Sequence, residues 1–164
     1  MSIIIFSRPI HSGKTTQLMK WCNLKKNIYG VLMPDINNFR KIYNIKTKEI
    51  FDIECTEAGD SKEPLTTVGR FNFYTAAFEK ANSIIISALS QDTDWLVIDE
   101  AGKLELEKKG FYKAIVEVAE KYNSNEKPGN LLVTVRESLC NEVISFFNFS
   151  NCRIITQLEE LPIK

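Results

Sequence analysis

The chain has 164 residues, 44% of them hydrophobic, so it can bury a substantial core but is too short for two ordinary domains. We therefore expect a single domain spanning residues 1–164. Twenty-one basic residues balance 21 acidic ones. The sequence contains no block of Lys and Arg residues, so nucleic-acid binding is not indicated.

The N-terminal segment predicts a buried strand followed by a phosphate-binding loop. Ile3-Ile4-Ile5-Phe6 is an apolar run, and Ser12-Gly13-Lys14-Thr15-Thr16 lies directly before a helical pattern. Backbone N–H groups in such a loop, together with the start of the helix, favour polyphosphate. Lys14 can reach the outer phosphates, and the Thr15 hydroxyl can bind Mg²⁺. A nucleoside triphosphate with Mg²⁺ is therefore the first ligand to consider.

This loop departs from the strict G-x-x-x-x-G-K-[ST] pattern, because Arg8 stands where the first glycine is expected. The side chains of Arg8 and His11 could crowd the loop, and neither residue suits a backbone with positive φ. A cation there could instead help to neutralise phosphate charge. We assign phosphate contacts to the whole loop, which comprises Arg8, Pro9, Ile10, His11, Ser12, Gly13, Lys14, Thr15 and Thr16.

The first residues also bear on localisation. No basic segment precedes the apolar run, and Arg8 and Pro9 interrupt it, which is typical neither of a signal peptide nor of a membrane span. We therefore expect a cytoplasmic protein with no membrane partner. Four widely spaced cysteines without a C-x-x-C pattern favour reduced thiols over a zinc site or a disulfide framework.

The next segments predict a helix, a strand, a hairpin and a loop. Apolar spacing favours a helix over residues 15–26 and a strand over residues 28–33. Alternating polar and apolar positions predict a β-hairpin within residues 39–55. Gly59 and Pro64 lie in residues 57–67, which we expect to form a mobile loop.

A second chemical motif follows a predicted helix over residues 75–89. Trp95-Leu96-Val97-Ile98-Asp99-Glu100 combines four apolar residues with two acids, as expected of a buried strand that delivers carboxylates to a sheet edge. In phosphate-loop proteins the first acid, here Asp99, holds Mg²⁺ directly or through water. Glu100 is then placed to orient or deprotonate the attacking water. We therefore predict Glu100 and Lys14 as catalytic residues, and Thr15 and Asp99 as metal ligands.

The remaining segments continue the alternation of helix and strand. We expect helices over residues 111–122 and 137–147, strands over residues 131–135 and 152–156, and a loop over residues 123–130. This alternation predicts an α/β three-layer sandwich, with a mainly parallel sheet, helices on both faces and an inserted β-hairpin. The nucleotide is expected at the carboxyl edge of the sheet.

The acidic segment also carries a resemblance to a known family. Val97-Ile98-Asp99-Glu100-Ala101-Gly102-Lys103-Leu104-Glu105-Leu106 contains a sequence that resembles D-E-x-G-x-x-E-L. That signature is typical of the nucleoside-triphosphatase family of thermophilic type, known in animals as cancer-related nucleoside triphosphatase and sometimes catalogued as nucleotide kinases. Weaker support comes from Gly30-Val31-Leu32, Val68-Gly69-Arg70-Phe71 and Leu131-Leu132-Val133-Thr134-Val135.

The resemblance implies a P-loop NTPase domain that hydrolyses the γ-phosphate of ATP, GTP and other nucleoside triphosphates with Mg²⁺. It implies that Gly13, Lys14, Thr15 and Thr16 bind phosphate and metal, that Asp99 holds Mg²⁺, and that Glu100 activates water. Gly102 would permit a tight turn beside the site. Lys103 and Glu105 match the signature without an assigned role, and a solvated ion pair is the alternative for both.

Two arginine positions of the family have no counterpart in the segments that resemble them. Residues 34–38, Pro34-Asp35-Ile36-Asn37-Asn38, lack the arginine that follows the glycine-led strand, and residues 156–160 lack the C-terminal asparagine-arginine element. Arg70 and Arg136 are candidates to reach the γ-phosphate, with a surface position as the alternative. Five aromatic residues are candidates to stack on a nucleobase: Phe39, Tyr43, Phe71, Phe73 and Tyr74. The alternative is that their rings pack in the core or in the hairpin.

Two other functions fit the same motifs. A nucleoside or nucleotide kinase would use the same loop and acids but would consume ATP only with an acceptor present, and the chain lacks the cysteine-rich zinc lasso of thymidine kinases. A non-catalytic binding module would retain nucleotide binding without turnover. The sequence identifies neither the preferred base nor a protein partner.

Overall fold

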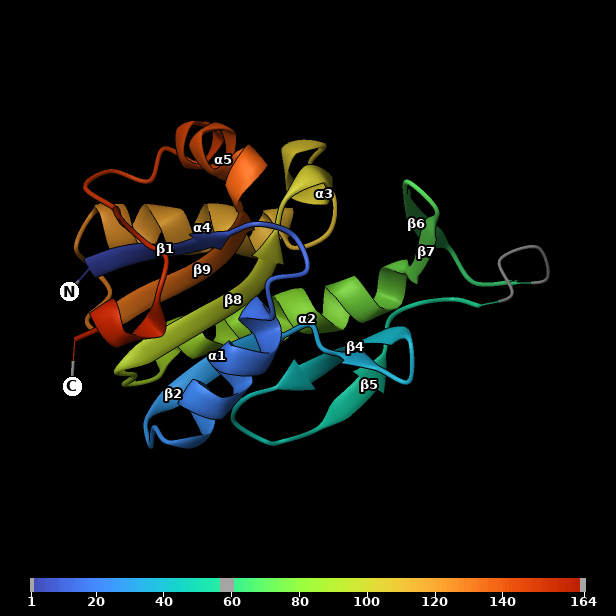
Figure 1. Cartoon of the computed structure of the whole chain (residues 1–164), viewed down its shortest axis with the longest axis horizontal. Coiled ribbons are helices and arrows are strands. Elements are labelled where there is room, and N and C mark those ends of the chain that lie inside the picture. The colour runs from blue at the N-terminus through green and yellow to red at the C-terminus, as the bar shows by residue number, and fades with distance from the viewer. Residues whose placement is uncertain (1, 57–60, 163–164) are drawn as a thin grey trace.

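The computed structural model describes residues 2–56 and 61–162 (Figure 1). Strands and helices alternate along most of the chain. In chain order the first half contains β1 (Ser2–Arg8), α1 (Lys14–Asn23), β2 (Ile28–Leu32), β3 (Asp35–Ile36), β4 (Phe39–Asn44), β5 (Ile50–Asp52), β6 (Leu65–Val68) and β7 (Phe71–Tyr74). The second half contains α2 (Thr75–Ser87), β8 (Trp95–Ala101), α3 (Lys103–Leu106), α4 (Tyr112–Asn123), β9 (Asn130–Arg136), α5 (Cys140–Phe146) and β10 (Arg153–Ile155).

The central sheet is mainly parallel. Its strand order is β10-β1-β9-β8-β2-β4-β3, with β5 paired to β4. The five strands from β10 to β2 are parallel to their neighbours, whereas β4 runs antiparallel to β2 and forms a hairpin with β5. The predicted α/β fold with an inserted hairpin is therefore confirmed, and the hairpin extends the sheet beyond β2.

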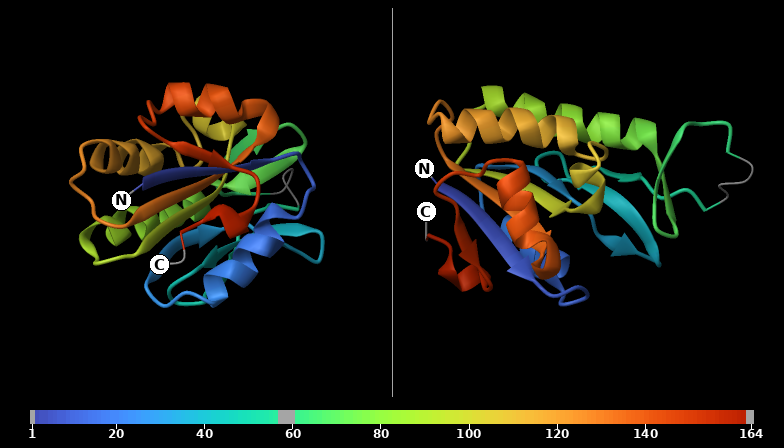
Figure 2. Two further views of the ribbon diagram at one scale, coloured as in Figure 1. Left: turned by 60° about the vertical axis from the view of Figure 1, so that its left-hand side comes forward. Right: turned by 90° about the horizontal axis from the view of Figure 1, so that it is seen from above.

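Helices cover both faces of this sheet, which gives three layers (Figure 2). Alternate residues of β1 show the division: Ile3 and Ile5 belong to the apolar cluster beneath α2, α4 and α5, and Ile4 and Phe6 to the cluster beneath α1. All four side chains are at most 4% exposed. Parallel strands buried on both faces require such continuous apolar runs, which is why these segments could be recognised in the sequence.

Gly30 lets the central strands approach closely. Its backbone has a φ of 120°, and a Cβ atom placed on it would lie 1.9 Å from the carbonyl oxygen of Val97 on the neighbouring strand β8. No side chain fits in this position without displacing backbone. The glycine is therefore required where β2 packs beside the strand that carries the acids.

Several segments differ from the sequence prediction. Residues 65–67, expected in a loop, form part of β6, which pairs with β7 through a turn at Gly69, while residues 57–60 of that loop lie outside the described residues. The first helix ends at Asn23 rather than at residue 26, and the segment expected to be helical from 137 begins with a 3-10 turn over Glu137–Leu139. Strand β3 and helix α3 were not predicted, because each is too short to show a periodicity.

None of the helices within residues 2–56 and 61–162 combines the length and the apolarity needed to cross a bilayer.

Candidate active site

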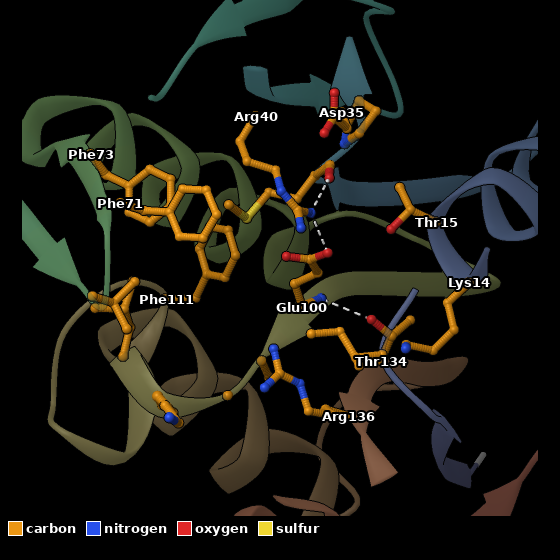
Figure 3. Close-up of a pocket in the computed structure, with 18 of the residues that line it drawn as sticks. Lys14, Thr15, Asp35, Arg40, Phe71, Phe73, Glu100, Phe111, Thr134 and Arg136 are labelled. Carbon is orange, nitrogen blue, oxygen red and sulfur yellow. Dashed lines mark hydrogen bonds and ion pairs between the residues drawn. The ribbon is translucent and has the colours of Figure 1, made fainter. Parts of the chain in front are cut away.

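A cleft of about 690 Å³ opens at the carboxyl ends of the parallel strands. The loop after β1 forms one side of it, and residues from β7, α2 and the segment around α3 form the other. Glu100, at the end of β8, lies between these sides (Figure 3). The volume is in the range of small-molecule binding sites, and the location is the one expected for ligands in α/β sheets.

Most of the predicted phosphate-binding loop lines this cleft. The seven residues from Ile10 to Thr16 are among its lining residues, whereas Arg8 and Pro9 are not. Arg8 is the last residue of β1, and its Nη1 donates a hydrogen bond to Oε1 of Gln17 at 2.8 Å. Of the two possibilities for Arg8, the structure shows its guanidinium bonded to Gln17 on α1 and not among the residues that line the cleft.

The loop turns through two residues with left-handed backbone. Gly13, which precedes α1, has a φ of 77°, and His11 has a φ of 58°. Of the two non-glycine residues in question, it is therefore His11, and not Arg8, that adopts the unfavourable left-handed conformation. His11 is exposed and is one of the residues that line the cleft.

Lys14 begins α1 and is held against the loop. Its Nζ donates hydrogen bonds to the carbonyl oxygens of Pro9 at 3.0 Å and Arg8 at 3.3 Å. Burial lowers the pKa of Lys14, and the nearby Arg136 and Arg8 act in the same direction, while Glu100 and Asp99 oppose them. The ammonium group therefore lies at the end of the cleft that the loop lines, near both acids.

Asp99 is fully buried and hydrogen-bonded through both of its oxygens. Oδ2 accepts from the Thr15 hydroxyl at 2.8 Å and from the backbone N–H of Met33 at 3.1 Å. Oδ1 accepts from the Thr134 hydroxyl at 2.5 Å. The two predicted metal ligands, Thr15 and Asp99, thus meet, but Thr15 lines the cleft and Asp99 lies beneath it.

The Thr15 hydroxyl and the Asp99 carboxylate are oxygen groups suited to Mg²⁺. This ion prefers oxygen ligands and keeps several water molecules when it binds nucleotide phosphates. Thr15 lines the cleft, and its hydroxyl donates to Asp99, which lies beneath it. No cluster of three or more His, Cys, Asp or Glu residues suited to a metal occurs within residues 2–56 and 61–162. A site made from one hydroxyl, one carboxylate and substrate phosphates needs no such cluster.

Glu100 points into the cleft because β8 is irregular at this residue. Its φ is 63°, and the register with β9 shifts between Ile98 and Ala101. The backbone N–H of Glu100 leaves the strand ladder and donates to the Thr134 hydroxyl at 2.8 Å. In a regular strand consecutive side chains point to opposite faces. The bulge therefore allows the acid beside Asp99 to reach the cleft, and this strained backbone coincides with the candidate site.

Arg40 forms an ion pair with Glu100, a contact that the sequence did not predict (Figure 3). Arg40 lies on β4, and its Nη1 donates to Glu100 Oε1 and to the carbonyl oxygen of Met33. Burial and Asp99 raise the pKa of Glu100, whereas Arg40 and Lys14 act to lower it. Arg40 thus brings a guanidinium group to Glu100 from outside residues 34–38.

Glu105 is not part of a solvated ion pair, which corrects that alternative. Its side chain is 2% exposed and accepts hydrogen bonds from the backbone N–H groups of Gly102 at 2.7 Å and Phe111 at 2.9 Å. Burial raises its pKa to about 7. Glu105 therefore fixes the turn after Glu100, while Lys103 is exposed at the cleft.

The remaining candidates are distributed around the cleft. Arg136 lines it near Lys14 but is exposed. Arg70 also lines it, and its guanidinium lies over the ring of Phe71, 5.0 Å from the ring centroid. Among the aromatic candidates Tyr43, Phe71 and Phe73 line the cleft. Phe39 and Tyr74 do not.

Thr134, like Arg40, is a residue of this site that the sequence analysis missed. It is fully buried in β9 and contacts both acids, through the Asp99 carboxylate and the Glu100 backbone. A polar residue inside the apolar run Leu131-Leu132-Val133-Thr134-Val135 is the signal that marks it, because a buried hydroxyl needs a partner.

Comparison with known proteins identifies the family and the fold of the chain. A family model described as NTPase matches residues 3–156. THEP1 from the hyperthermophile Aquifex aeolicus has a similar structure, with a TM-score of 0.70 and 21% identity over 95% of this chain and 89% of that chain. A human cancer-related nucleoside triphosphatase has a TM-score of 0.62 and 17% identity over 98% of this chain and 90% of that chain. At these identities the two structures establish the fold alone. No curated protein matches the sequence.

Proposed function

The chain belongs to the NTPase family, and we propose on this premise that it is a Mg²⁺-dependent nucleoside triphosphatase that hydrolyses the γ-phosphate of ATP, GTP and related nucleotides. The observation that carries the proposal is the position of Glu100. A bulge and an ion pair with Arg40 hold its carboxylate in the cleft that the phosphate-binding loop also lines.

Each residue has a distinct part in this reaction. The loop N–H groups and Lys14 hold the polyphosphate, and the Thr15 hydroxyl, backed by Asp99, binds Mg²⁺. When bound, the metal neutralises charge on the phosphate oxygens. Glu100 orients a water molecule and takes its proton as the water oxygen attacks phosphorus. The bond from phosphorus to the bridging oxygen then breaks, and the nucleoside diphosphate leaves.

Phosphate release is the first measurement for this proposal. Purified protein with ATP, GTP, CTP or UTP should release phosphate only when Mg²⁺ is present. Glu100→Gln should lower kcat by about 10²- to 10⁴-fold, because it removes the base but keeps the shape of the side chain. Glu107→Gln is the matched control, since Glu107 is exposed and pairs with Lys109 outside the cleft.

The same experiment separates the proposal from its alternatives. Nucleotide binding without phosphate release by the wild type would contradict hydrolysis and favour a binding module. Slow release that is unchanged by Glu100→Gln would also count against the proposed base. A nucleoside or nucleotide kinase would consume ATP only when an acceptor is added.

Two further parts of the proposal concern the protein as a whole. We propose that residues 1–164 act as a single nucleotide-binding domain, because both motifs contribute to one cleft. We also propose a cytoplasmic location, where nucleoside triphosphates are available. Cell fractionation of the tagged protein tests the second point.

A further inference from the structure

One hydroxyl group joins the two acids of the candidate site. Thr134 is fully buried in β9, and its Oγ1 accepts a hydrogen bond from the backbone N–H of Glu100 at 2.8 Å (Figure 3). The same hydroxyl donates to Oδ1 of Asp99 at 2.5 Å. A threonine hydroxyl has one proton, and a backbone N–H can only donate. Both hydrogen bonds therefore have a fixed direction, and the single proton of the Thr134 hydroxyl points to Asp99.

The bulge of β8 explains why a hydroxyl is needed at position 134. The neighbours of Thr134 on its own strand, Val133 and Val135, are fully buried apolar residues. Glu100 has a φ of 63°, and its N–H leaves the strand ladder, so this N–H needs another acceptor. An apolar side chain of the same size would leave the N–H unpaired. The Thr134 hydroxyl therefore stabilises the backbone conformation that brings Glu100 to the cleft.

Asp99 continues this chain of hydrogen bonds toward the loop after β1. Its second oxygen, Oδ2, accepts from the Thr15 hydroxyl at 2.8 Å and from the Met33 backbone N–H at 3.1 Å. Because the Thr15 hydroxyl donates to Asp99, the lone pairs of its oxygen can bind a metal ion in the cleft. The backbone of Glu100 and the hydroxyl of Thr15 are thus connected through two side chains, those of Thr134 and Asp99.

We propose that Thr134 is a positioning residue for the reaction, because its hydroxyl holds Asp99 and Glu100 in one fixed arrangement. The inference rests on the proposed function and adds to it a residue that acts through the two acids. Without this hydroxyl, the bulge that carries Glu100 would lose a hydrogen bond, and so would the carboxylate beneath Thr15. We therefore expect Thr134 to affect both the rate of the chemical step and the contribution of Mg²⁺ to binding.

Three variants test the role of the hydroxyl in turnover. Thr134→Val removes it and keeps the size of the side chain, so kcat for phosphate release at saturating Mg²⁺ and nucleotide should fall about 10²-fold, as expected when a reacting group is misplaced by about 1 Å. Thr134→Ser should retain most of the activity, because it keeps the hydroxyl. Thr93→Val is the matched control, since Thr93 is 2% exposed, precedes β8 and lies outside the cleft.

A double-mutant cycle separates positioning from a general loss of structure. Single-turnover rates with γ-labelled ATP or GTP are compared for Thr134→Val, Glu100→Gln and the double variant. If Thr134 acts through Glu100, Thr134→Val should cause little further loss in the Glu100→Gln background. A merely structural role should instead lower the rate by the same factor in both backgrounds.

Binding that depends on Mg²⁺ provides a second measurement, which needs no turnover. A non-hydrolysable analogue of ATP or GTP should raise the Tm of the wild type, and Mg²⁺ should increase this rise. In Thr134→Val the increase due to Mg²⁺ should be smaller, because Asp99 is held less firmly beneath Thr15. The rise in Tm without Mg²⁺ should be unchanged, and Thr134→Ser should behave as the wild type.

The outcomes separate this inference from the proposed function. Phosphate release by the wild type with an unchanged kcat in Thr134→Val would overturn the positioning role and leave hydrolysis in place. Equal losses in both backgrounds of the cycle, or an unchanged effect of Mg²⁺ on Tm, would also overturn it. Absence of phosphate release by the wild type would refute the triphosphatase itself and, with it, the reaction that Thr134 is proposed to serve.

Discussion

The carboxyl group of Glu100 is subject to opposing influences from its neighbours. Burial and Asp99 raise its pKa, and the Arg40 guanidinium counteracts them through a direct ion pair. In the reaction that we propose, Glu100 must be ionised to accept a proton, so this balance sets the fraction of active protein at a given pH. Arg40 favours the ionised form of Glu100.

Replacing Arg40 by Ala should raise the pKa of Glu100 further, since only the opposing influence is removed. The acidic limb of the profile of kcat/KM against pH should then move to higher pH, and activity should fall most at low pH. Lys41→Ala serves as the control, because Lys41 lies on the same strand and pairs with Asp52 instead. An unchanged acidic limb in Arg40→Ala would contradict the role of Glu100 as the base.

Glu105 should make stability depend on pH. Its pKa is about 7 in the folded protein and 4.5 as an ordinary carboxyl, so between these values the folded state binds more protons. The stabilisation is complete below about pH 4.5 and is lost as the pH rises through about 7, a total of about 3 kcal/mol.

The Glu105→Gln variant tests this dependence by urea unfolding at several pH values. It should be less stable than the wild type, because its amide NH₂ would face the backbone N–H of Gly102 or Phe111. The difference should narrow as the pH rises from about 5 to about 8. A constant difference would show that Glu105 does not titrate in this range, and Glu107→Gln provides the exposed control.

At the scale of elements, the packing of β2 against β8 depends on Gly30. Gly30→Ala should lower the free energy of unfolding by more than about 3 kcal/mol, because its Cβ would overlap the carbonyl oxygen of Val97. Gly69→Ala is a matched control at positive φ with no atom within 4 Å of the new Cβ, so it should cost about 1 kcal/mol. Equal losses in urea unfolding would contradict the close approach of the strands.

For the whole molecule, the cleft should couple nucleotide binding to stability. A Mg²⁺–nucleotide complex at 100 times its Kd should add about 2.7 kcal/mol to the free energy of unfolding, seen as a higher Tm. Lys14→Ala should reduce this gain, whereas Lys20→Ala, an exposed lysine on the same helix and outside the cleft, should not. Thr15→Ala should mainly reduce the dependence of the gain on Mg²⁺. A gain that is equal in Lys14→Ala would count against the phosphate site.

The fold and the two motifs were predictable, and several of the contacts that connect them were not. The runs Ile3-Ile4-Ile5-Phe6 and Trp95-Leu96-Val97-Ile98 show continuous apolar character because each strand is buried on both faces. Arg40 and Glu100 are 60 positions apart, and Thr134 and Asp99 are 35 apart. No periodicity or spacing reports that such residues meet.

Local sequence alone determined the alternation of strands and helices and the positions of the loop after β1 and of the two acids, because periodicity and turn chemistry act over a few residues. The tertiary structure decided that Glu100 lines the cleft while Asp99 lies beneath it, that Arg40 pairs with Glu100, and that four phenylalanines are among the lining residues of the cleft. These features follow from strand order, a bulge and packing, which bring distant segments together and are therefore absent from any local pattern.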